Sequence, residues 1–233
     1  MYTYKTVVSY SQVDSNQDVK LSQMVDYFQD GAVFDGESVG IGVNYLLDRH
    51  LAWLLSYWQV EIIEYPKHCE EIEVSAIPYL MKGPFGFRDF TIKNAKGELL
   101  VKAYSLWTLC DMQAQKPFRV PPEIAGAYVL GEQVDMDHGS RKLNLPEGGV
   151  KQDPFTVGRQ MLDTNLHVNN AQYIVIAQNY IPMDFKPQKM RVEYKAQAKM
   201  GDVMVPRVID LGDGWAVSLE NENGEEYAAV EFK

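Results

Sequence analysis

The sequence predicts an α+β fold made of two tandem units, each with a central helix wrapped by a curved antiparallel sheet. Three observations support this prediction: an internal repeat, a helical segment after an Asp- and Asn-rich loop in each half, and strand patterns that follow each helix. The chain has 233 residues, of which 46% are hydrophobic, and this is enough to bury a core in each of two modest domains.

The internal repeat consists of three short matches that occur in the same order in both halves. Residues 13–19 (VDSNQDV) align with residues 162–168 (LDTNLHV), and each stretch leads into a helical segment. Two further matches follow: QVE at 59–61 with RVE at 191–193, and KGE at 96–98 with NGE at 223–225. Ordered self-similarity of this kind indicates a duplicated structural unit.

The two central helices are expected at residues 21–34 and 170–180. Each follows a loop that contains Asp and Asn, and these residues cap helix starts by accepting backbone N–H bonds. Residues 72–77 (IEVSAI) alternate apolar and polar side chains, as a half-buried strand should. One hairpin is expected in each half: 87–93 with 99–109 around a turn at 94–97, and 215–220 with 227–232 around a turn at 221–224.

These elements divide the chain into an N-terminal unit at residues 1–128, a linker at 129–150 and a C-terminal unit at 151–233. The linker is rich in Gly, Pro and charged residues, a composition typical of connecting segments. Residues 37–57 form an insert between the first helix and the next strand, and the insert contains the apolar run LAWLL at 51–55.

Composition and charge argue against several classes of protein. The net charge of −10 makes the chain a poor binder of nucleic acid or of an anionic membrane surface. No apolar run approaches the roughly 20 residues that span a bilayer, and the first residues lack the pattern of a signal peptide. Cys69 and Cys110 are the only cysteines, so we expect core thiols in a reducing, cytoplasmic compartment rather than a disulfide framework.

The stretch with the most chemical potential is residues 163–170 (DTNLHVNN), where Asp163, Asn165 and His167 fall within five residues just before a helix. A carboxylate and an imidazole can activate a water or attack a carbonyl carbon. Unpaired backbone N–H groups at the start of the helix can stabilise an oxyanion. The first half has Asp18 at the place of His167, so the loop is structural in both halves, and only the second has the residue set for catalysis.

Other chemical motifs are weaker. His50, His68 and His138 have no second ligand at a suitable spacing, so no metal site is expected. The sequence contains no Gly-x-Ser-x-Gly elbow, which argues against a serine hydrolase.

The run at residues 163–170, followed by Tyr173, resembles the signature of the acyl-ACP thioesterase family, which comprises the plant enzymes that release fatty acids and their bacterial relatives. Similar family landmarks occur in order in the first half: WQVE at 58–61, YP at 65–66, LW at 106–107 and VPPEI at 120–124. The resemblance implies a double hotdog fold and hydrolysis of acyl-ACP to free fatty acid and ACP, which terminates fatty acid synthesis. It also implies that acyl carrier protein is the partner and that no cofactor is needed.

By the same resemblance, Asp163, Asn165 and His167 match the family's catalytic positions. One departure is evident, because the family's Glu–Cys pair is replaced by Gln197–Ala198. The remaining mechanism uses Asp163 as general base or as nucleophile, while His167 and Asn165 position the thioester or the water. Gln197 can hold a water, because an amide both donates and accepts hydrogen bonds.

Several alternatives stay open. A hotdog enzyme acting on another thioester, such as an acyl-CoA thioesterase or a hydroxyacyl dehydratase, is the second hypothesis, and a non-catalytic acyl-thioester sensor is the third. The run at 51–55 is either extra core or a wall of an acyl-chain pocket. The basic residues at 186–199 are either a docking patch for ACP or a solvated strand face. The sequence leaves acyl-chain length open, and also the choice between monomer and homodimer.

Overall fold

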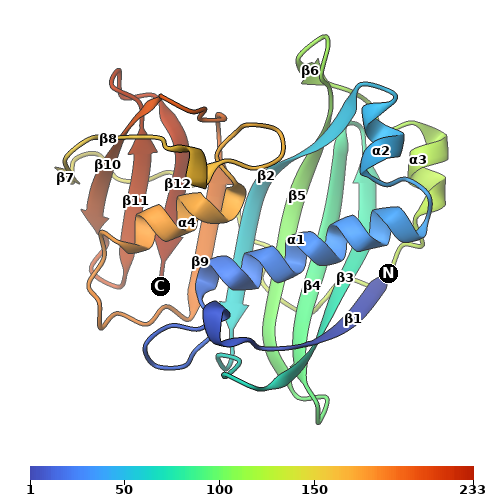
Figure 1. The fold of residues 1–233 in the computed structure, drawn as a ribbon, viewed down its shortest axis with the longest axis horizontal. Coiled ribbons are helices and arrows are strands. Elements are labelled where there is room, and N and C mark those ends of the chain that lie inside the picture. Colours follow the sequence, from blue (N-terminus) through green and yellow to red (C-terminus); the bar gives the residue numbers. More distant parts are fainter. The chain divides into compact units, whose positions relative to one another are not determined.

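The computed structural model describes residues 1–233, and the chain divides into two compact units (Figure 1). The first unit comprises Met1–Ser56 and Val60–His138, and the second comprises Tyr57–Gln59 and Gly139–Lys233. None of the helices has the length and apolar character needed to cross a bilayer.

The first unit is a sheet with one long helix across it. Its neighbouring strands run in the order β1-β3-β4-β5-β2, and the pairings from β1 through β5 are antiparallel. The strands are β1 (Tyr2–Val7), β2 (Leu51–Ile62), β3 (Glu71–Lys82), β4 (Phe85–Asn94) and β5 (Leu99–Asp111), with the short β6 (Lys116–Pro117) beside β5. The helices are α1 (Leu21–Ser38), α2 (Val43–Leu47) and α3 (Pro122–Ala127).

The core of the first unit lies between α1 and the sheet. Phe28 of α1 is fully buried, and its ring centroid lies 5.2 Å from that of Phe90 on β4. The predicted alternation at residues 72–77 is confirmed, because Ile72, Val74 and Ala76 are completely buried while the residues between them are partly exposed. This burial of one face of the sheet against one stripe of the helix supplies the main stabilisation of the unit.

The second unit repeats this plan with shorter elements. Its strands run in the order β9-β12-β11-β10-β7, and α4 (Asn170–Gln178) contacts β11 and β12. The strands are β7 (Val150–Lys151), β8 (Phe155–Thr156), β9 (Lys189–Tyr194), β10 (Val203–Asp210), β11 (Trp215–Glu220) and β12 (Glu226–Phe232), and β8 pairs with β10. A central helix against an antiparallel sheet in each unit confirms the architecture that the sequence predicts.

The two hairpin turns show that the repeat extends to individual hydrogen bonds. Asn94 Oδ1 accepts from the N–H groups of Lys96 and Glu98, each at 3.0 Å. Asn221 Oδ1 accepts from the N–H groups of Asn223 and Glu225, each at 2.9 Å. The fourth and last residue of both turns, Gly97 and Gly224, has φ 83°, a value that a residue without Cβ adopts at little cost. The predicted repeat is confirmed.

The insert at residues 37–57 differs from the prediction. Helix α1 continues to Ser38, and the apolar run at 51–55 is already part of strand β2. Leu51 packs in a buried cluster at one end of the unit, formed with Ile41, Leu46, Leu109, Val120, Ile124 and Tyr128. The run therefore contributes to the core, and the strand begins eight residues earlier than the match at 59–61 indicates.

Charged side chains of each sheet bind the segment at residues 129–150. In the first unit, Asp89 accepts from the N–H of Val134 at 2.7 Å, and its other oxygen lies 3.1 Å from His138 Nε2. In the second unit, Glu193 accepts from the N–H of Leu143 at 2.9 Å. Arg207 donates to the carbonyl of Gly148 at 2.8 Å. The segment is thus tied to each sheet by buried or half-buried ionic groups.

Candidate active site

The candidate loop, residues 162–168, lies between a 3-10 turn (Arg159–Met161) and helix α4. Leu162 and Val168 face each other in an isolated antiparallel bridge that closes the loop. Inside it, Asp163 Oδ1 accepts from the N–H of Asn165 at 2.8 Å and from the N–H of His167 at 3.1 Å. An aspartate that bonds the backbone ahead of it is a common device for a tight turn.

The start of α4 is capped by Asn169. Its side-chain oxygen accepts from the N–H of Ala171 at 2.8 Å, and its carbonyl accepts from the N–H of Gln172 at 2.9 Å. We expected unpaired N–H groups here as oxyanion donors, but these two are occupied by the cap. Side-chain donors of the loop are therefore the better candidates for that role.

A second segment, residues 195–199, runs beside the loop. Val168 N–H donates to the carbonyl of Ala198 at 2.9 Å, and His167 forms an isolated antiparallel bridge with Lys199. This backbone pairing brings Gln197 alongside the loop, although the Gln197 side chain is exposed and makes no hydrogen bond.

The structure thus brings the four predicted site residues to adjoining segments of one unit. Asp163 and His167 are half-buried, and Asn165 and Gln197 are exposed. Three of them are joined by hydrogen bonds: the Asp163 carboxylate accepts from the N–H groups of Asn165 and His167, and the Asp163 N–H donates to the His167 carbonyl at 2.8 Å. Gln197 lies on the neighbouring segment and has no hydrogen bond to these three.

The imidazole of His167 has an unusual environment. Its Nδ1 atom is buried and has no hydrogen-bond partner. A buried polar atom without a partner costs about 1–3 kcal/mol, so native proteins rarely keep one that has no purpose. The unpaired Nδ1 atom therefore distinguishes His167 from the hydrogen-bonded backbone groups of the loop.

Tyr173 of α4 lies next to the loop and is 2% exposed. Its hydroxyl oxygen accepts from the N–H of Ala198 at 3.0 Å. Burial raises the pKa of Tyr173 to about 12, and the negative charge of Asp163 is among the smaller contributions in the same direction. The tyrosine is therefore a neutral group close to the Asp163 carboxylate.

The matching loop of the first unit has the same backbone but different chemistry. Asp14 Oδ1 accepts from the N–H groups of Asn16 at 2.8 Å and Asp18 at 3.0 Å. At the place of His167, the carboxylate of Asp18 is buried and forms an ion pair with Lys67. The turn is a structural feature of both units, and the imidazole is specific to the second.

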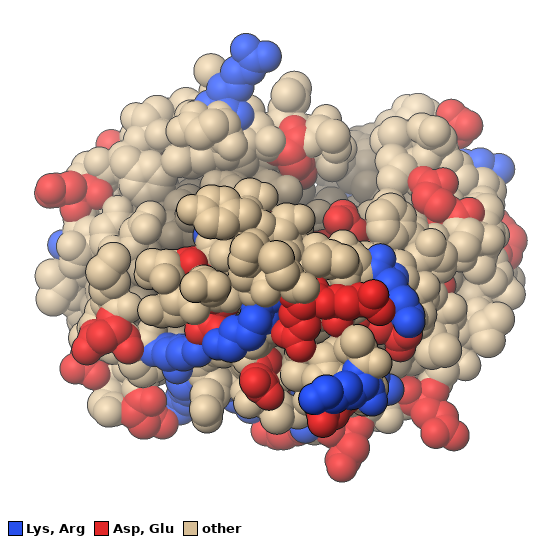
Figure 2. All heavy atoms as spheres, turned by 60° about the horizontal axis from the view of Figure 1, so that its bottom comes forward, with Lys and Arg blue, Asp and Glu red and all other residues tan.

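The basic residues predicted near the loop are partly neutralised. Arg191 pairs with Glu231 at 3.2 Å and donates to the Tyr57 hydroxyl at 2.8 Å. Lys195 forms ion pairs with Glu226 and, at 3.7 Å, with Glu193. Figure 2 shows acidic and basic side chains interspersed on the face that it presents. Arg191 and Lys195 therefore have local partners and offer little net positive charge for docking.

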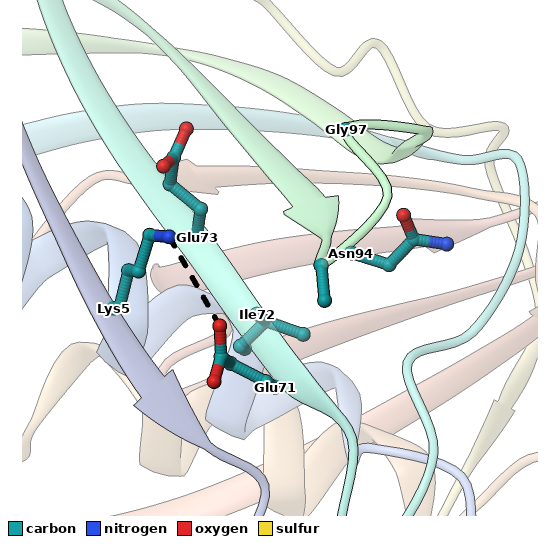
Figure 3. Close-up of a pocket in the computed structure, with 7 residues that line it drawn as sticks. Lys5, Glu71, Ile72, Glu73, Asn94 and Gly97 are labelled. Carbon is teal, nitrogen blue, oxygen red and sulfur yellow. Dashed lines mark ion pairs between the residues drawn. The ribbon is translucent and has the colours of Figure 1, made fainter.

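A surface depression lies in the first unit, whereas all four predicted site residues belong to the second (Figure 3). It is lined by Lys5, Glu71, Ile72, Glu73, Asn94, Ala95 and Gly97, and Lys5 lies 4.0 Å from Glu71. These residues belong to strands β1 and β3 and to the end of β4 with the turn after it, and none of the predicted site residues is among them. No group of three or more His, Cys, Asp or Glu side chains is placed to hold a metal ion.

Comparison with solved structures defines the fold class. An acyl-ACP thioesterase from Bacteroides thetaiotaomicron superposes with a TM-score of 0.90 at 21% identity, covering 99% of this chain and 96% of that one. The 12:0-ACP thioesterase from Umbellularia californica gives 0.86 at 20% identity, covering 100% and 96%. A single-unit protein, a 1,4-dihydroxy-2-naphthoyl-CoA thioesterase from Synechocystis, gives 0.51 at 15% identity and covers 54% of this chain and 93% of its own. The predicted double hotdog fold is confirmed.

Family models give the more specific assignment. Residues 1–128 match the acyl-ACP thioesterase N-terminal domain, and residues 147–232 match the acyl-ACP thioesterase C-terminal domain. The chain belongs to the acyl-ACP thioesterase family.

Two curated relatives are plant enzymes. A chloroplastic acyl-[acyl-carrier-protein] hydrolase of Cuphea viscosissima is 22% identical over 83% of this chain and 51% of its own length. A chloroplastic oleoyl-acyl carrier protein thioesterase of Arabidopsis thaliana is 22% identical over 87% of this chain and 62% of its own length. The chain spans about half the length of the first of these relatives.

Proposed function

We propose that this chain hydrolyses acyl-ACP thioesters to free fatty acid and ACP, and so terminates fatty acid synthesis. The observation that carries the proposal is the unpaired, buried Nδ1 of His167 in a loop whose copy in the first unit holds an ion-paired Asp18. Membership of the acyl-ACP thioesterase family supports the same activity, as do the printed functions of the plant relatives.

In this proposal Asp163 activates the water or attacks the thioester carbonyl itself. Its Oδ1 is bound by two backbone N–H groups, which hold the carboxylate in one orientation. Its Oδ2 makes no hydrogen bond in the protein and is free to accept a proton from water or to attack carbon. Positioning of this kind is what general-base and nucleophilic catalysis require.

Asn165 and His167 then bind the oxygen on which negative charge develops. Asn165 carries a side-chain amide, and His167 a ring nitrogen, that no group of the protein occupies, and each can donate an N–H when the ring nitrogen is protonated. Donors already in place when the charge forms stabilise the transition state more than the substrate, and this raises the rate of the chemical step. Gln197, on the segment beside the loop, holds the attacking water. It takes the place that the family gives to a carboxylate.

The remaining parts of the proposal concern the acyl chain and the compartment. In this proposal the first unit binds the acyl chain. It does not carry out the reaction, because its loop carries an ion pair where the second carries the imidazole. We place the reaction in the cytoplasm, where the free thiols of Cys69 and Cys110 stay reduced.

An acyl-CoA thioesterase is the second candidate. It is favoured by the likeness of about half the chain to a single-unit enzyme whose substrate is a CoA thioester. The two candidates differ in the carrier and share the chemistry, so the choice depends on how well each carrier is recognised.

The test is release of free thiol from acyl-ACP and acyl-CoA substrates that carry the same set of acyl chains. We expect kcat/KM for acyl-ACP to exceed that for acyl-CoA by about tenfold or more, equivalent to about 1.4 kcal/mol of carrier recognition. Equal values would remove ACP from the proposal and favour the second candidate. Formation of an enoyl thioester would indicate a dehydratase, and binding without turnover would indicate a sensor.

A further inference from the structure

The backbone around the candidate loop allows the two units to be matched residue by residue. In the first unit Val19 N–H donates to the carbonyl of Pro66 at 2.9 Å, and in the second Val168 N–H donates to the carbonyl of Ala198 at 2.9 Å. The bridges beside these bonds also correspond, with Asp18 facing Lys67 in one unit and His167 facing Lys199 in the other. Pro66 is therefore the structural counterpart of Ala198.

One hydrogen bond breaks this correspondence. Ala198 N–H donates to the hydroxyl of Tyr173 at 3.0 Å. Pro66 has no N–H to donate. The helix position that matches Tyr173 is Met24, because each lies four residues after the helix N-cap, and Met24 has only a weakly accepting thioether. The donor and the acceptor are thus absent together from the first unit.

The fold does not need this hydrogen bond. The first unit closes the same loop, with the same bridge and with the same left-handed residue (Gln17, φ 63°, against Leu166, φ 62°), without it. In the second unit the bond adds a constraint, because residue Ala198 is held by α4 through its N–H and by the loop through its carbonyl. Gln197 directly precedes this residue, which is held on both sides.

We propose that Tyr173 is a positioning residue, whose hydroxyl fixes residues 195–199 so that Gln197 faces the loop that carries Asp163 and His167. The inference rests on the proposed thioester hydrolysis and deepens it. Tyr173 reaches the reaction through the backbone of Ala198 and does not itself touch the substrate. Its neutral hydroxyl accepts a hydrogen bond and brings no second charge close to Asp163.

The first test is Tyr173→Phe, which removes only the hydroxyl. We expect kcat to fall by about tenfold or more with KM nearly unchanged, since a misplacement of about 1 Å costs about 100-fold in rate. Amide hydrogen exchange of residues 195–201 should accelerate. The matched control is Tyr4→Phe, which removes a tyrosine-to-backbone hydrogen bond of 2.8 Å in the first unit and should leave kcat unchanged.

The second test separates positioning from simple loss of stability. The double variant Tyr173→Met/Ala198→Pro copies the first unit and removes donor and acceptor together, so no buried N–H is left unpaired. We expect its melting temperature to recover toward that of the wild type while kcat stays low. Recovery of kcat together with stability would overturn the inference, because Tyr173 would then only satisfy a buried N–H.

The exchange measurement also distinguishes failure of this inference from failure of the proposed function. If the wild type releases no thiol from acyl-ACP or acyl-CoA, the proposed function fails. If Tyr173→Phe leaves exchange in residues 195–201 unchanged, the tether itself is absent and the inference fails, whatever the substrate.

Discussion

The loops at residues 13–19 and 162–168 are built on one backbone and differ in what that backbone presents. Each is closed by a bridge between its end residues, and each is organised by an aspartate that accepts two backbone N–H groups. In the first loop the residue before the closing valine is Asp18, buried in an ion pair with Lys67. In the second it is His167, whose buried Nδ1 has no partner.

This difference separates scaffold from chemistry within a single chain. Asp14 and Asp163 do the same structural work, so holding the turn cannot by itself identify a catalytic residue. The first loop has satisfied its buried charge, whereas the second retains an unsatisfied polar atom at the matching place. An unsatisfied group that a sister unit avoids is a stronger sign of function than any feature the two loops share.

The largest expected effect comes from exchanging the two aspartates for asparagine. Asp163→Asn keeps an oxygen that can accept the two N–H groups, so the turn should remain, but it removes the carboxylate. We expect kcat to fall by about 10²–10⁴-fold, the usual effect of removing a general base, or by more if Asp163 is the nucleophile. Asp14→Asn is the matched control and should leave kcat unchanged. Equal losses in both variants would contradict the assignment of the active site to the second unit.

In a second pair of variants, one should lose activity and keep its stability, and the other should lose stability and keep its activity. His167→Ala should lower kcat by about 100-fold without lowering the free energy of unfolding, because its Nδ1 has no partner to lose and the cost of burying it unpaired is relieved. Asp18→Ala should lower the free energy of unfolding by about 1–3 kcal/mol, because it removes a buried carboxylate that is ion-paired.

The measurements are steady-state kinetics and denaturant unfolding of both variants. A kinetic loss in Asp18→Ala larger than its loss of folded protein would mean that the first loop also takes part in the reaction. A large destabilisation in His167→Ala would mean that the imidazole is a structural group.

The parts of the fold that local chemistry determines were predictable from the sequence. The start of α4, the alternation at 72–77 and the hairpin turns at Asn94 and Asn221 follow from capping, side-chain period and turn residues. Helix α1 also begins at the predicted Leu21, but its N-cap residue, Lys20, makes no capping hydrogen bond through its side chain. Strand β2 was predicted too short, because its first residues form the continuous apolar run LAWLL, which has no period of two. Strand β10 was not predicted at all, and Pro206 in its middle weakens the pattern.

The candidate site was predictable to a similar degree. Asp163, Asn165 and His167 lie within five residues, so one loop had to hold them together. The bond between Tyr173 and Ala198 joins residues 25 apart in sequence, and only tertiary structure brings them together. The signal that could have found it is the alignment of Pro66 with Ala198, because a proline opposite an alanine marks an N–H that only one unit possesses.

A smaller effect is expected from a change at Gln197. Its counterpart in the first unit is Tyr65, because these residues directly precede the matched pair Ala198 and Pro66. Tyr65 is buried, and besides burial the charges of Asp18 and Asp14 raise its pKa, so this position is close to the loop in the first unit. Gln197→Glu should therefore place a second carboxylate near Asp163. Like-charge repulsion raises one of the two pKa values, so the pH–rate profile should gain or shift an acidic limb while the enzyme stays active. An unchanged profile would mean that position 197 does not face the loop.

The smallest expected effect concerns the two central helices. Asp26 of α1 corresponds to Val175 of α4, since each lies six residues after the N-cap. Burial, and then the charge of Asp30, raise the pKa of Asp26 from 3.8 to about 6. Between these two values the folded protein holds a proton that the unfolded chain has lost, so the stability of the wild type falls as pH rises through this window. The first unit thus carries a partly buried charge at neutral pH that the second unit avoids.

Asp26→Asn removes this titration. Relative to the wild type, the variant should gain stability as pH rises from 4 to 7, by about 1 kcal/mol at pH 7 after allowing for the exposed part of the side chain. Melting temperatures of both proteins across this range measure the difference. Asp30→Asn is the control. It removes the second cause of the raised pKa of Asp26, so the pH range over which stability falls should become narrower without disappearing. A difference between Asp26→Asn and wild type that stays constant with pH would show that Asp26 titrates normally and that burial in α1 is too slight to matter.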